Sequence, residues 1–246
     1  YPASLFDMSR CGFNRKRALI ERLNHRLHVV SPSFFLADYI SEALPDVSLS
    51  VVPNWVDREF TSEVEALCLS DELLRFSSAG IRVLVMANDL SDPSKVDFDL
   101  VIRISELRFV QIHTIGHNSP FRGSRVVNHG LVYDRKNMVE IISDSDVAIF
   151  TSQKDTFGLV LIEILACGVP VLAVSSMASD EVMGGVGLTT LGDADSILQS
   201  IASSVMPSCY SVMSRKMLSC QVLSRYSVDS SINKYIDIYN RLKRTF

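Results

Sequence analysis

A strand, a helix with almost no polar face and a second strand follow one another in the segment 151–174, TSQKDTFGLVLIEILACGVPVLAV. This segment constrains the fold most, because residues 159–166 are apolar on every side of the expected helix except at Glu163. Such a helix must be covered on nearly all sides. Gly168 and Pro170 predict that it ends abruptly before the next strand. The segment therefore indicates a layered α/β protein.

The beginning of this helix carries residues suited to holding an anion. Asp155 and Thr156 are of types that cap helices, and Gly158 lets another group approach the first turn. The free N–H groups of that turn would face a loop opening, where they could bind a phosphate. Glu163 poses a separate question. A buried carboxylate without a partner is costly, so we expect a cation or an amide donor beside it.

Apolar strands alternate with amphipathic helices through most of the chain. The sequence predicts strands at 27–30, 47–52, 81–87, 109–116, 125–132, 146–151 and 171–175. It predicts helices at 14–26, from Phe34 after the Ser31-Pro32-Ser33 cap, and at 96–107, 135–143, 194–205, about 211–225 and 228–243. Residues 58–80 are charged and only weakly helical, which indicates a linker. Buried strands alternating with helices predict a parallel sheet covered by helices.

Composition disfavours several classes of protein. A net charge of −4 gives no electrostatic basis for binding nucleic acid. The five cysteines lack C-x-x-C spacing, which argues against a zinc site or a disulfide framework and favours a reducing cytoplasm. The longest apolar run, 158–174, is interrupted by Glu163 and Pro170 and is shorter than the ~20 apolar residues of a spanning helix. Because the sequence starts at Tyr1, we expect it to begin inside a longer protein.

The central segment resembles the acidic-x7-Glu signature of the retaining, nucleotide-sugar-dependent glycosyltransferases of family 4. The matching residues are Asp155, Phe157, Gly158, Leu159, Glu163, Ala166, Gly168, Pro170 and Val171. Asp155 and Glu163 stand eight residues apart, as the signature requires. The resemblance implies a GT-B-type, Rossmann-like α/β fold, with a parallel sheet that has helices on both faces, plus an incomplete second α/β domain. It also implies retention of configuration at the anomeric carbon.

The resemblance assigns roles to particular residues. Asp155, the shorter equivalent of the usual Glu, would touch the donor sugar, and Glu163 would bind the ribose hydroxyls; these two are the expected catalytic residues. The loop amides would meet the donor's diphosphate together with a lysine after the first strand of the second domain. The expected donor-binding residues are Lys95, Gly116, Thr156, Phe157, Gly158, Leu159, Glu163 and Glu181. A nucleotide sugar is then the small-molecule partner, and no metal or other cofactor is expected.

The same resemblance implies domain boundaries. Residues 1–53 would end an acceptor-side domain, 54–80 would form the linker, 81–226 the donor-binding domain, and 227–246 a helix that crosses back. The sequence also departs from the family pattern. Trp55 takes the place of a glycine in the turn 53–57, Met177 and Ala178 replace two glycines before Glu181, and no arginine precedes Lys95 in its loop. We therefore expect an altered turn at Trp55, since a bulky residue avoids positive φ.

Two functions from different classes remain open. The first is a glycosyltransferase that passes a sugar to a cell-surface polysaccharide or lipid-linked acceptor, in the cytoplasm and in peripheral contact with the membrane's inner face; this chain would carry mainly the donor site. The second is a catalytically decayed nucleotide-binding or partner protein, favoured by the missing glycines. A Rossmann oxidoreductase is disfavoured, because no G-x-G-x-x-G follows a first strand. Ordinary structural roles also remain open: a helix cap for Asp155, a solvated lysine for Lys95, a turn for Gly116 and a helix-start acid for Glu181.

Overall fold

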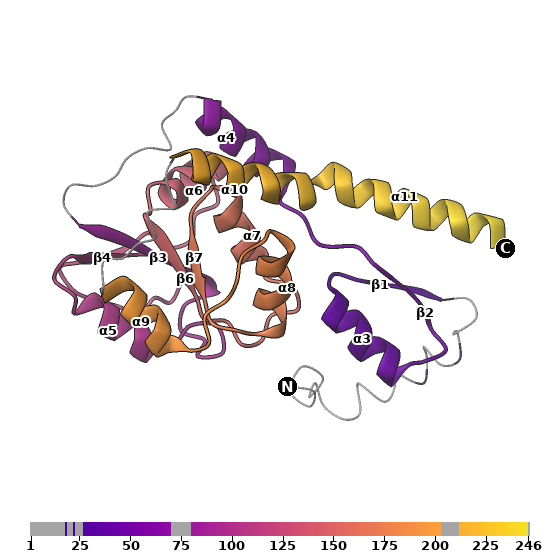
Figure 1. Ribbon diagram of the computed structural model, residues 1–246, viewed down its shortest axis with the longest axis horizontal. Coiled ribbons are helices and arrows are strands. Elements are labelled where there is room, and N and C mark those ends of the chain that lie inside the picture. The colour runs from indigo at the N-terminus through magenta and orange to yellow at the C-terminus, as the bar shows by residue number, and fades with distance from the viewer. Residues whose placement is uncertain (1–17, 19–21, 23–26, 70–79, 203–211, 246) are drawn as a thin grey trace.

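The computed structural model describes residues 18, 22, 27–69, 80–202 and 212–245. Within these ranges the chain forms two parallel sheets, a two-stranded one and a five-stranded one (Figure 1). We refer to residues 27–52, which contain the small sheet, as the first region, and to residues 80–226, which contain the large sheet, as the second region. None of the helices in the described ranges combines the length and the apolar character that a bilayer span requires.

The large sheet has the order β5-β4-β3-β6-β7, and every pair of neighbours is parallel. Its strands are β3 (Ile81–Asp89), β4 (Val110–His117), β5 (Val126–Asn128), β6 (Val147–Phe150) and β7 (Val171–Ala173). Val83 of β3 lies opposite Ile112 of β4 and Val147 of β6. The parallel sheet expected from the sequence is thus confirmed. Strand order reverses between β3 and β6, and ligands of such sheets bind at the carboxyl ends of the strands there.

Helices cover both faces of this sheet (Figure 1). On one face lie α5 (Phe98–Ser105) and α9 (Ala194–Ala202), whose residues Leu100, Ile104 and Ile197 are fully buried. The other face is covered by α6 (Arg135–Ser143), α7 (Leu159–Ala166), α8 (Met177–Gly185) and α10 (Val212–Arg225). In α7 the fully buried residues are Leu161, Ile162, Ile164, Leu165 and Ala166, as the apolar sequence of this helix requires. Gly168, with φ of 70°, follows the Cys167 C-cap and ends this helix where the sequence predicts.

The first region consists of β1 (His28–Ser31), α3 (Phe34–Ala43) and β2 (Ser48–Val51). The two strands are parallel, and α3 connects them. The His28 ring is within 2.7 Å of Ser48 Oγ and 2.9 Å of Ser50 Oγ, which ties the strands together on one side. Both strands and the helix lie where the sequence predicts them. The helix expected at 14–26 lies outside the described residues except at Ala18 and Arg22, which are helical.

The segment expected to be a linker contains a helix, α4 (Arg58–Leu69), which differs from our expectation. Phe60 and Val64 of α4 are buried in the same core as α6 and α7. Phe60 and Val64 stand one helical turn apart, and the partly buried Leu67 and Cys68 continue this apolar stripe in the next turn. The same helix also carries three glutamates and an arginine. The many charges in the sequence hide that stripe. The linker interpretation is therefore corrected for residues 58–69, which belong to the core of the second region.

The chain crosses between the regions twice, and the two crossings lie side by side. Near Val56 the chain leaves the first region, and its N–H donates to Tyr226 O at 2.9 Å. The last helix, α11 (Val228–Thr245), runs back along the first region (Figure 1). Ser231 Oγ of α11 donates to Pro53 O at 2.9 Å. The Trp55 ring meets the Tyr235 ring edge to face, with centroids 6.4 Å apart, so the tryptophan at this turn packs against the crossing helix.

Candidate functional site

The candidate site lies at the carboxyl ends of β3 and β6, where the order of the sheet reverses. Two loops meet there, one after β3 and one after β6. Gln153 N–H donates to Ser94 O at 3.0 Å, and the Thr151 hydroxyl accepts from Asp97 N–H at 2.9 Å. Asp97 in turn caps α5 by accepting from Leu100 N–H at 3.0 Å. These bonds hold the two loops together and fix the positions of Lys95 and Asp155.

Lys95 and Asp155, both expected from the sequence, form an ion pair across these loops. Lys95 Nζ donates to Asp155 Oδ1 at 2.7 Å and to Lys154 O at 3.1 Å. Both side chains are partly buried. The expected capping role of Asp155 is not observed, because the N-cap of α7 is Gly158 and the carboxylate turns to Lys95 instead. A cation and an acid are thus adjacent in the loops that lead into α5 and α7.

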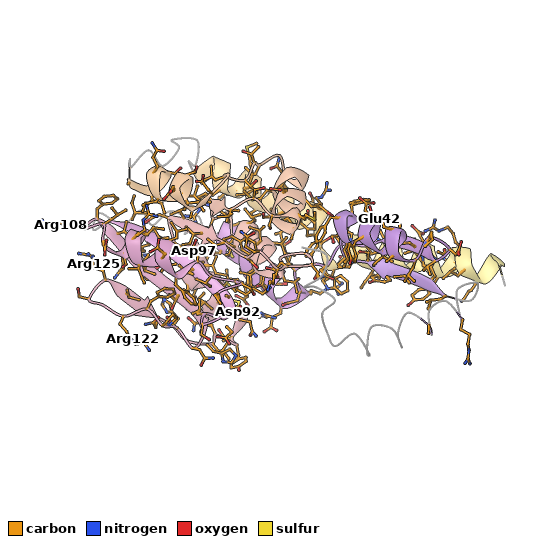
Figure 2. The ribbon with its side chains drawn as sticks, turned by 90° about the horizontal axis from the view of Figure 1, so that it is seen from below. Glu42, Asp92, Asp97, Arg108, Arg122 and Arg125 are labelled. Atoms are coloured by element: carbon orange, nitrogen blue, oxygen red, sulfur yellow. The ribbon has the colours of Figure 1, made fainter. Side chains whose placement is uncertain are left out.

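Figure 2 places the neighbours of this loop on the molecule. Asp92 and Asp97, on either side of Lys95, lie in the second region, and Glu42 lies on α3 of the first region (Figure 2). The labelled arginines, Arg108, Arg122 and Arg125, lie at the end of the molecule away from the first region.

The residues leading into α7 each have a distinct environment. Gly158 has φ of 92°, a left-handed conformation that favours glycine. Phe157 is buried and packs edge to face against Tyr226, with ring centroids 5.6 Å apart. The Thr156 carbonyl accepts from Ser33 Oγ of the first region at 2.8 Å. Leu159, the first residue of α7, is 47% exposed. The loop thus contacts both regions of the chain.

Glu163 shares a cation with a second carboxylate. Arg135 Nη1, at the start of α6, lies 3.9 Å from Glu163 Oε1, and Arg135 Nη2 lies 2.7 Å from Asp57 Oδ2. Burial raises the pKa of Glu163 to about 7; Arg135 lowers it and Asp57 raises it further. The Glu163 side chain is 19% exposed. The sequence required a partner for Glu163 but did not identify Arg135 or Asp57, because only the fold brings α6 and the turn before α4 to this point.

Gly116 stands at the end of β4, beside β3. Its φ is 143°, and its N–H donates to Gly130 O at 2.8 Å. A Cβ atom at this position would collide with the carbonyl oxygen of Ala87 and press on the Leu90 side chain at 3.1 Å. Glycine is therefore required for the ends of the strands to approach one another next to the site.

Glu181 contacts the first region of the chain. Its two carboxylate oxygens accept from the N–H groups of Phe34, at 2.9 Å, and Phe35, at 3.0 Å, and so cap α3. Before it, Ser176 and Ser179 form a capping box at the start of α8. Met177, where the family pattern has glycine, is 54% exposed, and Ala178 is buried. These two bonds join Glu181 to α3. They do not link it to Lys95, Asp155 or Glu163, the other charged residues expected at the site.

Two of the histidines, His113 and His129, lie side by side. His113 Nδ1 lies 3.1 Å from His129 Nε2, and burial together with the neighbouring ring lowers the pKa of His113 to about 4. Both rings are therefore neutral near neutral pH, because burial also lowers the pKa of His129. In the part of the chain that the structure describes, no three His, Cys, Asp or Glu side chains are grouped so that they could hold a metal.

Comparison with known sequences points to one class of enzyme. Residues 124–185 match the sequence model of the glycosyl transferases group 1. The chain is also 27% identical, over 98% of its length, to WcaC of Escherichia coli (strain K12), described as a candidate colanic acid biosynthesis glycosyl transferase. It spans 60% of the length of that relative. The matched segment contains Asp155, Glu163 and Glu181.

Solved structures share the fold. Sucrose-phosphate synthase from Thermosynechococcus elongatus superposes with a TM-score of 0.74 at 17% identity, covering 100% of this chain and 66% of that protein. HepE from Anabaena, solved with UDP and glucose, superposes with a TM-score of 0.68 at 17% identity, covering 92% of this chain and 67% of HepE. The chain therefore has the α/β fold of the GT-B glycosyltransferases, and its segment 124–185 matches the glycosyl transferases group 1.

Proposed function

We propose that this chain forms the donor-binding part of a retaining glycosyltransferase of family 4, which transfers a sugar from a nucleotide sugar to a growing cell-surface polysaccharide or a lipid-linked acceptor. The observation that carries the proposal is the ion pair between Lys95 and Asp155 in the two loops at the strand ends where the sheet order reverses, the second of which leads into α7. The names of the relatives support it, since HepE was solved with UDP and WcaC is described for colanic acid biosynthesis. The reaction would occur in the cytoplasm, in peripheral contact with the membrane.

The geometry suits a nucleoside diphosphate sugar. The first-turn amides of α7, together with Lys95, would bind the diphosphate, so that no metal is needed to offset its charge. Lys95 would then exchange part of its bond to Asp155 for the phosphate oxygens, and the released carboxylate would accept from a hydroxyl of the donor sugar. Glu163, one turn further along α7, would accept from the ribose hydroxyls. Gly116 keeps the adjacent strand ends close, and Glu181 holds α3 against the second region.

A second function shares the nucleotide site but not the catalysis. Met177 is exposed at the start of α8, and Ala178 is buried beside it, where the family pattern has two glycines. Side chains at these positions restrict the approach of a donor sugar to the start of α8. A partner protein that binds a nucleotide but no longer transfers sugar would still need Lys95 and Glu163 for that binding. Met177 would not hinder it, because no donor sugar has to approach the start of α8. The two functions therefore differ in sugar transfer, and both require nucleotide binding.

The test is a calorimetric titration of the chain with UDP and with GDP. Lys95→Gln and Glu163→Gln should each weaken binding about tenfold, because each removes a charge-assisted hydrogen bond worth about 1.5 to 3 kcal/mol. Arg103→Gln is the matched control, since Arg103 pairs with Asp99 and Asp195 on the face of the sheet opposite α7. Absence of binding by the native chain to both nucleotides, or equal affinities for all the variants, would overturn the proposal. Transfer from a radiolabelled sugar nucleotide to membrane lipids separates the two functions.

A further inference from the structure

Arg135 lies between two carboxylates that belong to different parts of the molecule. Glu163 is on α7 within the second region, whereas Asp57 is in the turn where the chain leaves the first region. We infer that Arg135 is a positioning residue for the nucleotide site: it sets the charge and orientation of Glu163, and Asp57 competes with Glu163 for it. This inference rests on the proposed function, because it assumes that Glu163 accepts hydrogen bonds from the ribose hydroxyls of the nucleotide.

The distances show which carboxylate holds the guanidinium. The contact of 2.7 Å to Asp57 is a close ion pair, whereas the separation of 3.9 Å from Glu163 exceeds hydrogen-bond length. Asp57 is itself fixed, since its other oxygen accepts from Phe60 N–H at 2.8 Å and caps α4. Arg135 is therefore anchored to the turn between the regions. Because the guanidinium fork is rigid, this anchor leaves Arg135 close to Glu163 but incompletely bonded to it.

This arrangement controls when Glu163 is ionised. With its pKa near 7, Glu163 is protonated in part of the molecules at neutral pH. A protonated carboxyl has less capacity to accept hydrogen bonds than a carboxylate, and ribose hydroxyls donate more strongly to the charged form. Nucleotide affinity should therefore rise as pH increases through about 7. A closer Arg135 would shift that rise to lower pH, and a lost Arg135 would shift it to higher pH.

Other charged groups around α7 are engaged elsewhere. Arg215 of α10 donates to Gly168 O and Ser143 O. On α7's own C-terminal side, burial raises the pKa of the Cys167 thiol, which keeps it neutral. Asp155, in the loop before α7, is paired with Lys95. Glu181, on α8, accepts from the first N–H groups of α3. Arg135 and Asp57 are the charges that act directly on Glu163.

The experiment measures the affinity for UDP-glucose between about pH 5.5 and 8.5, a range chosen to bracket the Glu163 pKa near 7. UDP-glucose is the probe because its diphosphate is a diester and does not titrate in that range.

Arg135→Gln should move the midpoint of the pH dependence upward and weaken binding several-fold at pH 7. Asp57→Asn should move the midpoint downward and strengthen binding at pH 6, while the amide it introduces keeps an oxygen for Phe60 N–H. A shift of one pH unit corresponds to about a tenfold change in affinity on the acid side of the midpoint.

Further variants separate failure of this inference from failure of the proposed function. Arg135→Lys, which keeps the charge, should restore most of the native midpoint, and Arg103→Gln should leave it unchanged. Glu163→Gln should bind more weakly at high pH and lose the pH dependence. If Glu163→Gln behaves as the native chain does, the ribose role of Glu163 is wrong. If Glu163→Gln has this effect but Arg135→Gln and Asp57→Asn both keep the native midpoint, the ribose role stands and the role of Arg135 is overturned. Melting curves of each variant show that it is folded.

Discussion

Glu163 has a side chain whose surroundings oppose its charge. It is largely buried among apolar residues of α7, and the nearest guanidinium is bonded more closely to Asp57. A carboxyl group whose pKa is raised in the folded state binds protons more tightly there than in the unfolded chain. Between the ordinary value of 4.5 and about 7, the folded protein therefore holds more protons, and the contribution of Glu163 to stability falls as pH increases.

The prediction that follows concerns Glu163→Gln in the absence of nucleotide. A neutral amide avoids the cost of ionising a buried carboxyl, so the variant should be at least as stable as the native chain above pH 7, by up to about 3 kcal/mol. Near pH 5 the two should melt at similar temperatures. Thermal unfolding at pH 5 and pH 8 makes the comparison. If the variant is several kcal/mol less stable at pH 8, Glu163 serves mainly as a structural partner of Arg135.

At the scale of elements, the start of α3 depends on a residue far from it in sequence. The sequence places Ser33 as the cap, and Ser33 is indeed the N-cap residue, but its hydroxyl donates to Thr156 O instead of accepting from the helix. The first amides of α3 bind the carboxylate of Glu181, 147 residues away from Phe34. An acid at the positive end of a helix is favoured by the helix dipole, so this contact stabilises α3 and joins the two regions.

Replacing Glu181 with alanine should loosen α3. We expect a loss of about 0.5 to 2 kcal/mol, the usual cost of removing a helix cap, and faster hydrogen exchange at the amides of Phe34 and Phe35. Hydrogen exchange resolved by residue measures both the place and the size of the effect. Glu140→Ala, at an exposed position of α6, is the control and should leave those amides unchanged. Equal protection of α3 in native chain and Glu181→Ala would show that another group caps the helix.

At the scale of the whole molecule, α11 connects the regions by packing one face and exposing the other. Ile238 is 5% exposed, on the side of the helix that faces β2 residues around a cavity of about 650 Å³. Ile236, two residues earlier on the same helix, is 48% exposed. The helix therefore offers two isoleucines of the same chemistry in opposite environments.

Ile238→Ala should destabilise the chain, whereas Ile236→Ala should have little effect. Truncation of a buried isoleucine costs about 2 to 5 kcal/mol, while surface substitutions usually change stability by less than about 0.5 kcal/mol. Both variants carry the same propensity change in the helix, so the difference between their melting temperatures isolates the packing term. Equal melting temperatures would mean that α11 is not docked on the first region in solution.

Much of the fold follows from local pattern. The strands β1, β2, β3, β4, β6 and β7 and the helices α3, α6, α7 and α9 lie where the sequence predicts them, because apolar spacing along a short segment already encodes its period and its buried face. The end of α7 at Gly168 was likewise predictable from glycine and proline. Helix α4 was missed because its charged residues obscure an apolar stripe in which Phe60 and Val64 are buried and Leu67 and Cys68 are half-buried.

The contacts of the site were decided by the tertiary structure. Sequence singled out Lys95, Asp155, Glu163 and Glu181, and it required a partner for Glu163 without naming one. Only the fold shows that Lys95 pairs with Asp155, 60 residues away. It also shows that Arg135 lies between Glu163 and Asp57, and that Glu181 binds the start of α3. The physical reason is that periodicity reports which face of a segment is buried, whereas the partner of a charged group depends on how distant segments are brought together, and that is set by the order of the strands and the packing of the helices on them.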